Sequence, residues 1–194
     1  MTATDSSGRG VTAWLTGLPS AGKSSIAEAT ATLAASRGLA VQVLDGDELR
    51  RTLCAGLGFS REDRITNVRR IGYVAELLAR NGIIALVAVI APHRVARDAV
   101  RAHHERAGTR FLEVHVDAPV EICSLRDRKG LYARQRAGTL TGLTGVDDGY
   151  DRPEAPDLRL LTATHTVDAC AREVLQLVTD RAQVAAISGK GRPS

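Results

Sequence analysis

The stretch GLPSAGKS, residues 17–24, decides the fold of this chain, because it matches the phosphate-binding loop pattern G-x-x-x-x-G-K-[S/T] at every fixed position. The apolar run 11–16 before it predicts a buried strand, and the run 25–34 after it predicts a helix. In that context the glycines let backbone N–H groups point at a phosphate, and the positive end of the helix dipole adds to the attraction. The stretch therefore predicts a nucleoside triphosphate site.

Two residues of this loop have a defined chemical role. Lys23 is expected to reach the β- and γ-phosphates, and the Ser24 hydroxyl is expected to bind Mg²⁺. The alternative is a glycine-rich turn between a strand and a helix, with a solvated lysine. We expect the ATP-binding residues of the loop to be Gly17, Pro19, Ser20, Ala21, Gly22, Lys23, Ser24 and Ser25.

The composition is that of an ordinary globular protein. The chain has 194 residues, of which 44% are hydrophobic and 25% are charged, and this length predicts one domain with a substantial core. No apolar run approaches the roughly 20 residues of a membrane span, and residues 1–9 lack the apolar core of a signal peptide. We therefore expect a cytoplasmic protein that does not bind a membrane.

The net charge and the aromatic content indicate the class of partner, and the cysteines indicate whether a zinc site or a disulfide is expected. The net charge is +4 and aromatic residues make up only 3% of the chain, which offers little for stacking on single-stranded nucleic acid. We expect anionic small molecules as partners, and no nucleic acid. The three cysteines are far apart and are expected to be buried thiols, with neither a zinc site nor a disulfide framework: Cys54, Cys123 and Cys170.

Apolar runs alternate with helical stretches along the chain, and this order predicts an α/β fold with a parallel sheet and helices on both faces. Besides the first strand and helix, we expect strands at 39–44, 83–90, 110–116 and 158–161, and helices at 48–54, 62–80, 92–106, 119–125 and 167–184. Residues 10–184 form one predicted domain. The aperiodic segments 1–9 and 185–194 are expected to be disordered tails.

Residues 126–156 lack periodicity and are rich in glycine and proline. So long a segment without predicted secondary structure is unusual inside a compact domain unless it has a function. Five cationic residues cluster in its first part: Arg126, Arg128, Lys129, Arg134 and Arg136. The segment is therefore interpreted as a mobile lid that closes over phosphates. The alternative is a solvated surface loop.

Carboxylates follow the second predicted strand, where they face the same crevice as the phosphate loop. Asp45 and Asp47 are candidates for a metal partner and for the group that orients an attacking hydroxyl, although Asp45 could equally be a helix cap. Further along, the exposed aromatic Phe59 precedes a helix that is expected to carry three polar side chains near one face: Arg64, Asn67 and Arg70. The combination suits a nucleotide-like acceptor, whereas a plain solvated helix face would look the same.

The sequence resembles the adenylylsulfate kinases from about residue 10 to residue 182. The resemblance rests on motifs in a fixed order: WLTGLPSAGKS at 14–24, LDGD at 44–47, LGFS at 57–60 with DR at 63–64, Asn67 with RRIG at 69–72, KGLY at 129–132, and TG at 144–145 with DD at 147–148. The phosphate loop is generic to many enzymes. The remaining motifs, in this order, are far more specific to the family.

This resemblance implies a nucleoside-monophosphate-kinase-like P-loop fold with a five-stranded parallel sheet, flanking helices and a lid at about 126–156. The implied reaction transfers the ATP γ-phosphate to the 3′-hydroxyl of adenylyl sulfate, in the activation and assimilation of sulfate, and gives 3′-phosphoadenylyl sulfate and ADP. The implied cofactor is Mg²⁺, with Ser24 and Asp45 as its ligands. We further expect a homodimer.

Matched position by position, the family pattern assigns Lys23 and Asp47 as the catalytic residues, with the Asp47 carboxylate near the 3′-hydroxyl. Arg126 corresponds to a residue that packs on the ATP adenine, and Phe59 to one that stacks on the acceptor adenine. The expected acceptor-binding residues are Asp47, Arg50, Phe59, Arg64, Asn67, Ile90, Ala91, Lys129, Gly142 and Leu143.

The chain departs from the family pattern at several positions. Ala91 replaces a serine that some members phosphorylate, and Leu143 replaces the second aromatic ring of the adenine clamp. Glu48, Thr66 and Arg128 also differ from the usual residues. Two other functions are kept open: another small-molecule P-loop kinase, acting on a sugar acid or a different nucleotide, and a nucleotide-binding regulatory module without turnover.

Overall fold

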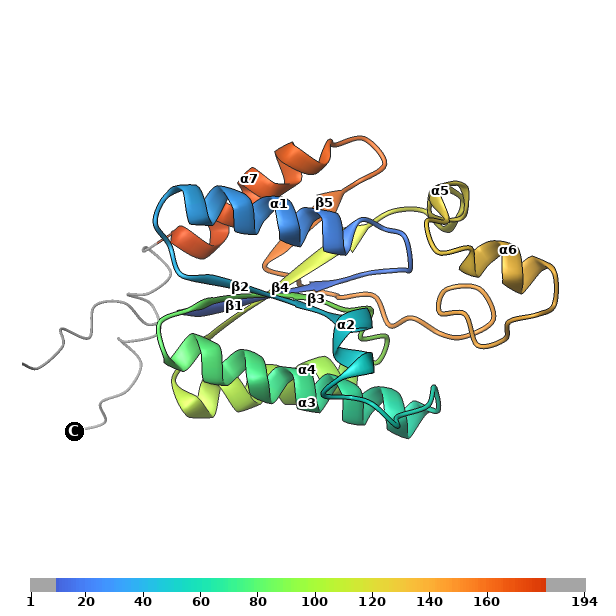
Figure 1. Ribbon diagram of the computed structural model, residues 1–194, viewed down its shortest axis with the longest axis horizontal. Helices are drawn as coiled ribbons and strands as arrows, with labels where there is room; N and C mark the ends of the chain where they lie inside the picture. Colours follow the sequence, from blue (N-terminus) through green and yellow to red (C-terminus); the bar gives the residue numbers. More distant parts are fainter. Residues whose placement is uncertain (1–9, 181–194) are drawn as a thin grey trace, which may run out of the picture.

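A computed structural model describes residues 10–180 of the chain. Within them, five parallel strands form one sheet in the order β2-β3-β1-β4-β5 (Figure 1). The strands are β1 (Val11–Thr16), β2 (Val41–Asp45), β3 (Ile84–Ala88), β4 (Arg110–Asp117) and β5 (Leu158–Leu161). The predicted α/β class and the five-stranded parallel sheet are therefore confirmed.

Long helices cover both faces of this sheet. The pair α1 (Lys23–Ser36) and α7 (Val167–Thr179) packs on one face, and α3 (Arg61–Arg80) and α4 (Arg94–Ala107) pack on the other (Figure 1). The shorter α2 (Gly46–Arg51), α5 (Val120–Arg126) and α6 (Leu131–Arg136) lie near the carboxyl ends of the strands, where α5 and α6 project away from the sheet.

The sheet separates two hydrophobic clusters. Successive side chains of β1 alternate between them: Ala13 and Leu15 belong to the cluster under α1 and α7, whereas Trp14 belongs to the cluster under α3 and α4. All six residues of β1 are buried, as expected for the middle strand of a parallel sheet that is covered on both faces.

The strand β4 is more buried than its alternating sequence suggests. Five of its eight residues are buried, including both Phe111 and Leu112 on opposite faces. The reason is its position between β1 and β5, with helices on both sides, which buries side chains of either direction. The uniformly apolar β3 is buried throughout.

Several predicted boundaries are wrong by a few residues. Asp45 caps α2, which therefore begins at Gly46 and ends at Arg51 instead of spanning 48–54. The helix expected from Pro92 begins at Arg94, after the N-cap His93. The closing helix ends at Thr179, and the rest of its predicted span, 181–184, lies outside the described residues together with both predicted tails.

Residues 126–156 contain the helix α6, which the sequence pattern did not predict. α6 has only six residues, too few to show a 3.6-residue pattern, and its Tyr132 is buried while the helix surface carries arginines. The helix α3 is capped at both ends: Ser60 Oγ accepts a hydrogen bond from Asp63 N at 3.1 Å, and Gly82 after the helix has φ 82°.

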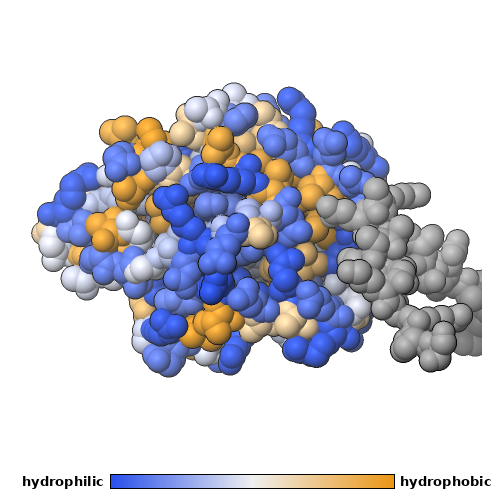
Figure 2. Space-filling model, turned by 180° about the vertical axis from the view of Figure 1, so that it is seen from behind, coloured by the Kyte–Doolittle hydropathy of each residue, from blue (hydrophilic) through white to orange (hydrophobic). Residues whose placement is uncertain are grey.

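The molecular surface is mostly polar on the face that Figure 2 shows, with apolar residues in smaller groups between hydrophilic ones. Among residues 10–180, no helix combines the length and the apolar character that crossing a bilayer requires.

The close packing of α3 on α4 yields a stability prediction. A Cβ atom on Gly72 would lie only 2.5 Å from Val100 Cγ2, and the β-branched valine has little freedom to move away. Gly72→Ala should therefore lower the free energy of unfolding by about 1–2 kcal/mol, although alanine is the better helix former. Urea denaturation measures the change.

The matched background for this test is Val100→Ala, which removes the clashing methyl groups. Gly72→Ala should be much less destabilising there, or even stabilising. Equal costs in both backgrounds, or a Gly72→Ala protein as stable as the parent, would show that the two helices do not meet at this pair.

Candidate functional site

The carboxyl ends of the strands open into a cleft of about 900 Å³, the position where ligands bind in open parallel sheets. Five parts of the chain line it: the phosphate loop, the start of α2, Phe59 with the first turns of α3, residues 88–92 after β3, and residues from 126 onward.

The phosphate loop is bent by residues with positive φ angles. Ser20 has φ 60° and Gly22 has φ 112°, and glycine is the residue that accepts such values without strain. Gly17 is required for a different reason, because a Cβ atom there would lie 2.3 Å from the carbonyl oxygen of Val116 on β4. The loop sequence therefore matches the space that its neighbours leave.

Other elements hold the loop from outside through its carbonyl oxygens. The Tyr132 hydroxyl of α6 donates to Pro19 O at 3.0 Å, and Thr162 Oγ1 donates to Ala21 O at 2.8 Å. The first-turn amides of α1, like those of any helix, have no acceptor within the helix and are available to a ligand. The loop thus has the form of an anion-binding site.

The Lys23 side chain is buried beneath the loop, with 8% of its surface exposed. Its ammonium group donates to Gly17 O at 2.9 Å and to Leu18 O at 2.7 Å. Burial lowers the pKa of Lys23 to about 7, because the charged form loses its hydration. A bound phosphate would provide the negative charge that this environment lacks.

Ser24 and Asp45 form the candidate metal site. Ser24 Oγ donates to Asp45 Oδ2 at 2.6 Å, and the other carboxylate oxygen of Asp45 accepts from Asp47 N at 2.8 Å. Asp45 is therefore a helix cap, and it also lies beside the hydroxyl of the phosphate loop. Within the described residues, no group of three or more His, Cys, Asp or Glu side chains could hold a metal ion. The pair instead suits Mg²⁺, which commonly binds one or two protein oxygens together with phosphates and water.

Asp47 and Lys129 form an ion pair at the mouth of the cleft. Both side chains are more than half exposed, at 58% and 56%, so the pair contributes little to stability. Its position matters more, because it joins α2 to the segment that follows α5.

A cationic and aromatic cluster lines the side of the cleft opposite α1. The Phe59 side chain is 69% exposed. The Arg50 guanidinium lies 4.4 Å from the centre of its ring and the Arg64 guanidinium 5.6 Å. Arg50 also donates to Gly58 O at 3.1 Å, which fixes the short turn before Phe59. An exposed ring with two cations beside it can bind a planar group that carries anions.

Arg64 also binds the far part of the 126–156 segment. Its guanidinium donates to Gly142 O at 2.8 Å and to Thr144 Oγ1 at 3.1 Å, and it pairs with the Asp148 carboxylate at 3.2 Å. Nearby, the buried Asn67 lines the cleft, and its Oδ1 has no hydrogen-bond partner among the described residues. An unpartnered buried amide oxygen is an acceptor available to a ligand.

The structure brings most of the predicted site residues into this one cleft: Pro19 to Ser25 of the loop, Asp45, Asp47, Arg50, Phe59, Arg64, Asn67, Ile90, Ala91, Arg126 and Lys129. Gly17, the first residue of the loop, does not line the cleft. Gly142 meets the site only through its carbonyl bond to Arg64.

Two sequence-based placements are wrong. Leu143 is 5% exposed and belongs to the hydrophobic core, so its side chain does not face the cleft as half of an adenine clamp. Arg70 is exposed and donates to Leu53 O at 3.2 Å, away from the cleft. Six residues along a helix amount to 600°, so Arg70 is turned about 120° from Arg64.

The sequence did not predict several other residues that line the cleft. Thr162, His165, Val167 and Cys170 line it near Arg126, which donates to Ala21 O at 3.2 Å and to Thr162 Oγ1 at 3.1 Å. Thr162 directly follows β5, and the rule that strand ends face the crevice could have identified it. His165, Val167 and Cys170 carry no comparable signal.

A second hollow, of about 950 Å³, lies on the other side of the phosphate loop, between Leu18, the start of α5 and residues 145–152. Its charged side chains have mixed signs, and of the phosphate loop only Leu18 lines it. The first cleft, which most of the loop lines, is therefore the candidate site.

Comparison with known proteins agrees with this geometry. Residues 9–161 match the family model described as adenylylsulphate kinase. The chain is 48% identical over 176 residues to an adenylyl-sulfate kinase of Synechococcus sp. (strain JA-2-3B'a(2-13)), covering 91% of this chain and 98% of the relative.

Two solved structures are also similar. The Mycobacterium tuberculosis APS kinase CysC in complex with AMPPNP and APS has a TM-score of 0.86 and 46% identity, over 89% of this chain and 99% of the other. A hexameric APS kinase from Thiobacillus denitrificans has a TM-score of 0.65 and 34% identity, over 88% of this chain and 29% of the other.

The lowered pKa of Lys23 predicts proton uptake on binding of a nucleoside triphosphate. With a pKa of about 7, only about a tenth of the free protein carries a charged Lys23 at pH 8. Phosphate oxygens beside the amine favour the charged form, so binding should take up close to one proton at this pH. Calorimetric titration in two buffers with different ionisation enthalpies measures the number.

Lys23→Met provides the control, because it keeps the apolar stem and removes the titrating group. The uptake specific to Lys23 should disappear in this variant, and in the parent it should fall toward zero below pH 6. Equal proton uptake by parent and variant at pH 8 would rule out a neutral Lys23 in the free protein.

Proposed function

The chain belongs to the adenylylsulfate kinase family, and from this premise we propose how its cleft carries out the reaction. The enzyme transfers the γ-phosphate of ATP to the 3′-hydroxyl of adenylyl sulfate, giving 3′-phosphoadenylyl sulfate and ADP. One observation carries the assignment to this cleft: the phosphate loop faces, across one continuous hollow, an exposed aromatic ring with two arginines beside it.

The donor half binds ATP at the phosphate loop. The first-turn amides of α1 bind the phosphate oxygens, and Lys23 exchanges its two carbonyl acceptors for the β- and γ-phosphates. Arg126 and Thr162 line the end of the cleft beyond Ala21, where the adenine of ATP packs. Because the Arg126 guanidinium is held by Thr162 and Ala21, it presents a fixed planar surface.

Mg²⁺ is the metal that this donor half would use. Ser24 and Asp45 would hold it, and the ion would neutralise charge on the β- and γ-phosphates during transfer. Hydroxyl and carboxylate oxygens are the hard ligands that Mg²⁺ requires, so the residues present fit the ion.

The acceptor half lies on the α2 and α3 side. The adenine of adenylyl sulfate stacks on the exposed ring of Phe59, and Arg50 and Arg64 meet its phosphosulfate group. Asn67 offers its unpartnered Oδ1 to the acceptor. Asp47 accepts a hydrogen bond from the 3′-hydroxyl and orients that oxygen toward the γ-phosphate.

The segment 126–156 acts as a lid in this proposal. Lys129 leaves its ion pair with Asp47 when substrates bind and turns toward the transferring phosphoryl group. The Arg64 contacts to Gly142 and Asp148 already hold the far end of the segment against the acceptor half. Closure would exclude water from the reaction.

Family membership removes the alternative of a kinase for an unrelated small molecule. A regulatory module without turnover remains as an alternative from another class. The complete set of Lys23, Ser24 and Asp47 around one cleft favours catalysis, because a binding module has no need of a carboxylate at the acceptor hydroxyl. We also propose a cytoplasmic homodimer. Exposed apolar residues such as Leu125 and Val146, and the self-assembly of the hexameric relative, support a dimer.

A coupled ADP-release assay with a panel of acceptors tests the function. Adenylyl sulfate should be turned over much faster than AMP, gluconate or water, and chelation of Mg²⁺ should stop the reaction. Identification of 3′-phosphoadenylyl sulfate by chromatography confirms the site of transfer. ATP binding without ADP release from any acceptor would favour the regulatory module.

The stacking role of Phe59 makes a separate prediction. Phe59→Ala should weaken adenylyl sulfate binding by about tenfold or more, because an aromatic stack adds roughly 0.5–1.5 kcal/mol to the buried area that is also lost. ATP affinity should change little. Titration of each ligand against the variant measures both.

Tyr73→Ala is the matched control, since Tyr73 is a similarly exposed aromatic residue, at 55%, on the outer surface of α3. It should alter neither affinity. If Phe59→Ala behaves like Tyr73→Ala, the acceptor base binds elsewhere.

A further inference from the structure

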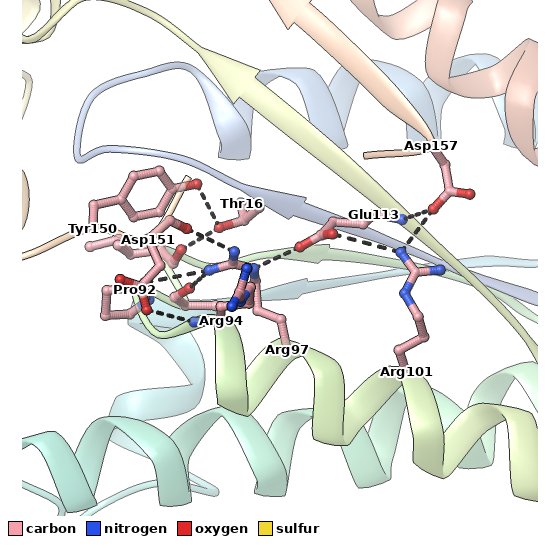
Figure 3. A network of polar contacts seen from close by, with 11 residues as sticks. Thr16, Pro92, Arg94, Arg97, Arg101, Glu113, Tyr150, Asp151 and Asp157 are labelled. Carbon is pink, nitrogen blue, oxygen red and sulfur yellow. Dashed lines mark hydrogen bonds and ion pairs between the residues drawn. The ribbon is translucent and has the colours of Figure 1, made fainter. Parts of the chain in front are cut away.

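Arg97 of α4 is a buried cation whose contacts join three parts of the chain beside the cleft (Figure 3). Its side chain is 2% exposed, and its Nε pairs with the Glu113 carboxylate of β4 at 2.6 Å. Its Nη1 donates to Ala91 O at 2.8 Å, and its Nη2 donates to Asp151 O at 2.7 Å. Neither the phosphate loop nor the acceptor cluster contains this residue.

The first part that Arg97 holds is a wall of the cleft, since Ile90, Ala91 and Pro92 line it after β3. Ala91 has φ 45°, a left-handed conformation that is unfavourable for a residue with a Cβ atom and persists only where its surroundings impose it. Arg97 holds the Ala91 carbonyl, and Thr16 Oγ1 holds the preceding one by donating to Ile90 O at 2.5 Å.

The second part is the end of the 126–156 segment. Asp151 N donates to Pro92 O at 2.9 Å, and the Asp151 carboxylate accepts from Arg94 N at 2.9 Å (Figure 3). The adjacent Tyr150 hydroxyl lies 3.0 Å from Thr16 Oγ1. Asp148, three residues before Asp151, pairs with Arg64 in the acceptor half of the cleft. The segment is thus fixed at both Arg64 and Arg97.

The contacts require an arginine. A buried charge is unfavourable unless it is paired and hydrogen-bonded, and Glu113 together with the two carbonyls meets this condition. The planar guanidinium places donors in three directions of one plane, toward Glu113, Ala91 and Asp151. A lysine has a single nitrogen and cannot reach all three at once.

We propose that Arg97 is a positioning residue for the acceptor half of the cleft. It fixes the Ile90–Pro92 wall and the end of the 126–156 segment relative to each other, and thereby sets the place of Asp148 and Arg64 at the phosphosulfate of the acceptor. The proposal rests on the proposed function for its kinetic consequence. Its structural content, the joint anchoring of two segments, can be measured without substrate.

The substitution Arg97→Lys tests both the kinetic consequence and the joint anchoring of the two segments. The KM for adenylyl sulfate should rise by about tenfold or more, while the KM for ATP stays within about twofold, because contacts of the wall and segment are lost and those of the phosphate loop are kept. In hydrogen exchange, the Asp151 and Arg94 amides, which bond across the two segments, should lose protection together. A merely structural role would lower the unfolding temperature and the active fraction but leave both KM values unchanged.

Arg101→Lys is the matched control. Arg101 lies one turn further along α4 and approaches the same Glu113 at 3.6 Å and Asp157 at 3.1 Å, but it touches neither segment at the cleft. It should change neither KM nor the exchange of the two amides. If Arg97→Lys does not fold, the double variant Arg97→Met with Glu113→Gln removes both buried charges, so no unpaired one is left.

The outcomes separate the two proposals. Unchanged exchange at Asp151 and Arg94 in the folded variant would overturn the positioning role, and so would an unchanged KM for adenylyl sulfate in an active protein. A parent protein that does not turn over adenylyl sulfate would overturn the proposed function. In that case the exchange measurement still decides whether Arg97 anchors the two segments.

Discussion

The turn between β1 and α1 is the constraint on which the rest of the structure depends. It needs space on the β4 side, because Val116 O leaves no room for a Cβ atom at Gly17. It also needs outside donors for its carbonyls, which Tyr132 and Thr162 provide from distant parts of the chain. The middle strand of the sheet thus ends in a loop whose carbonyls are held from outside, and the helix that follows presents its first-turn amides to a phosphate. Elements that follow much later in the sequence complete a site that begins at residue 17.

Buried cations are the second recurring feature. Lys23, Arg64 and Arg97 are each less than a tenth exposed, and each donates to backbone carbonyl oxygens near the cleft. The carbonyls accept hydrogen bonds from Lys23 but supply no full negative charge, so a phosphate that does supply one is favoured beside this amine. Arg64 and Arg97 instead have carboxylate partners and hold the chain in place. Buried basic side chains thus serve both the binding of anions and the positioning of the chain around the cleft.

The segment 126–156 connects the two halves of the site. Its beginning contributes Arg126, which donates to Ala21 O of the phosphate loop, and Lys129, which pairs with Asp47. Its middle contributes Tyr132, a core residue that holds the phosphate loop. Its end is fixed to the acceptor half through Arg64 and to the Ile90–Pro92 wall through Arg97. Because one segment contacts both halves, its position affects how donor and acceptor groups face each other.

The phosphate loop, the alternation of strands and helices, the parallel sheet and the family could all be predicted from the sequence. They depend on the local spacing of motif residues and on apolar runs that are long enough to be recognised. The sequence also identified Asp45 and Asp47, which follow a predicted strand, and Phe59, which precedes a predicted helix. Only the tertiary structure decided that Leu143 packs in the core, that Arg70 turns away from the cleft, and that Arg97 joins two segments 60 residues apart. Burial and long-range hydrogen bonds depend on which elements become neighbours, and no local pattern of residues carries that information.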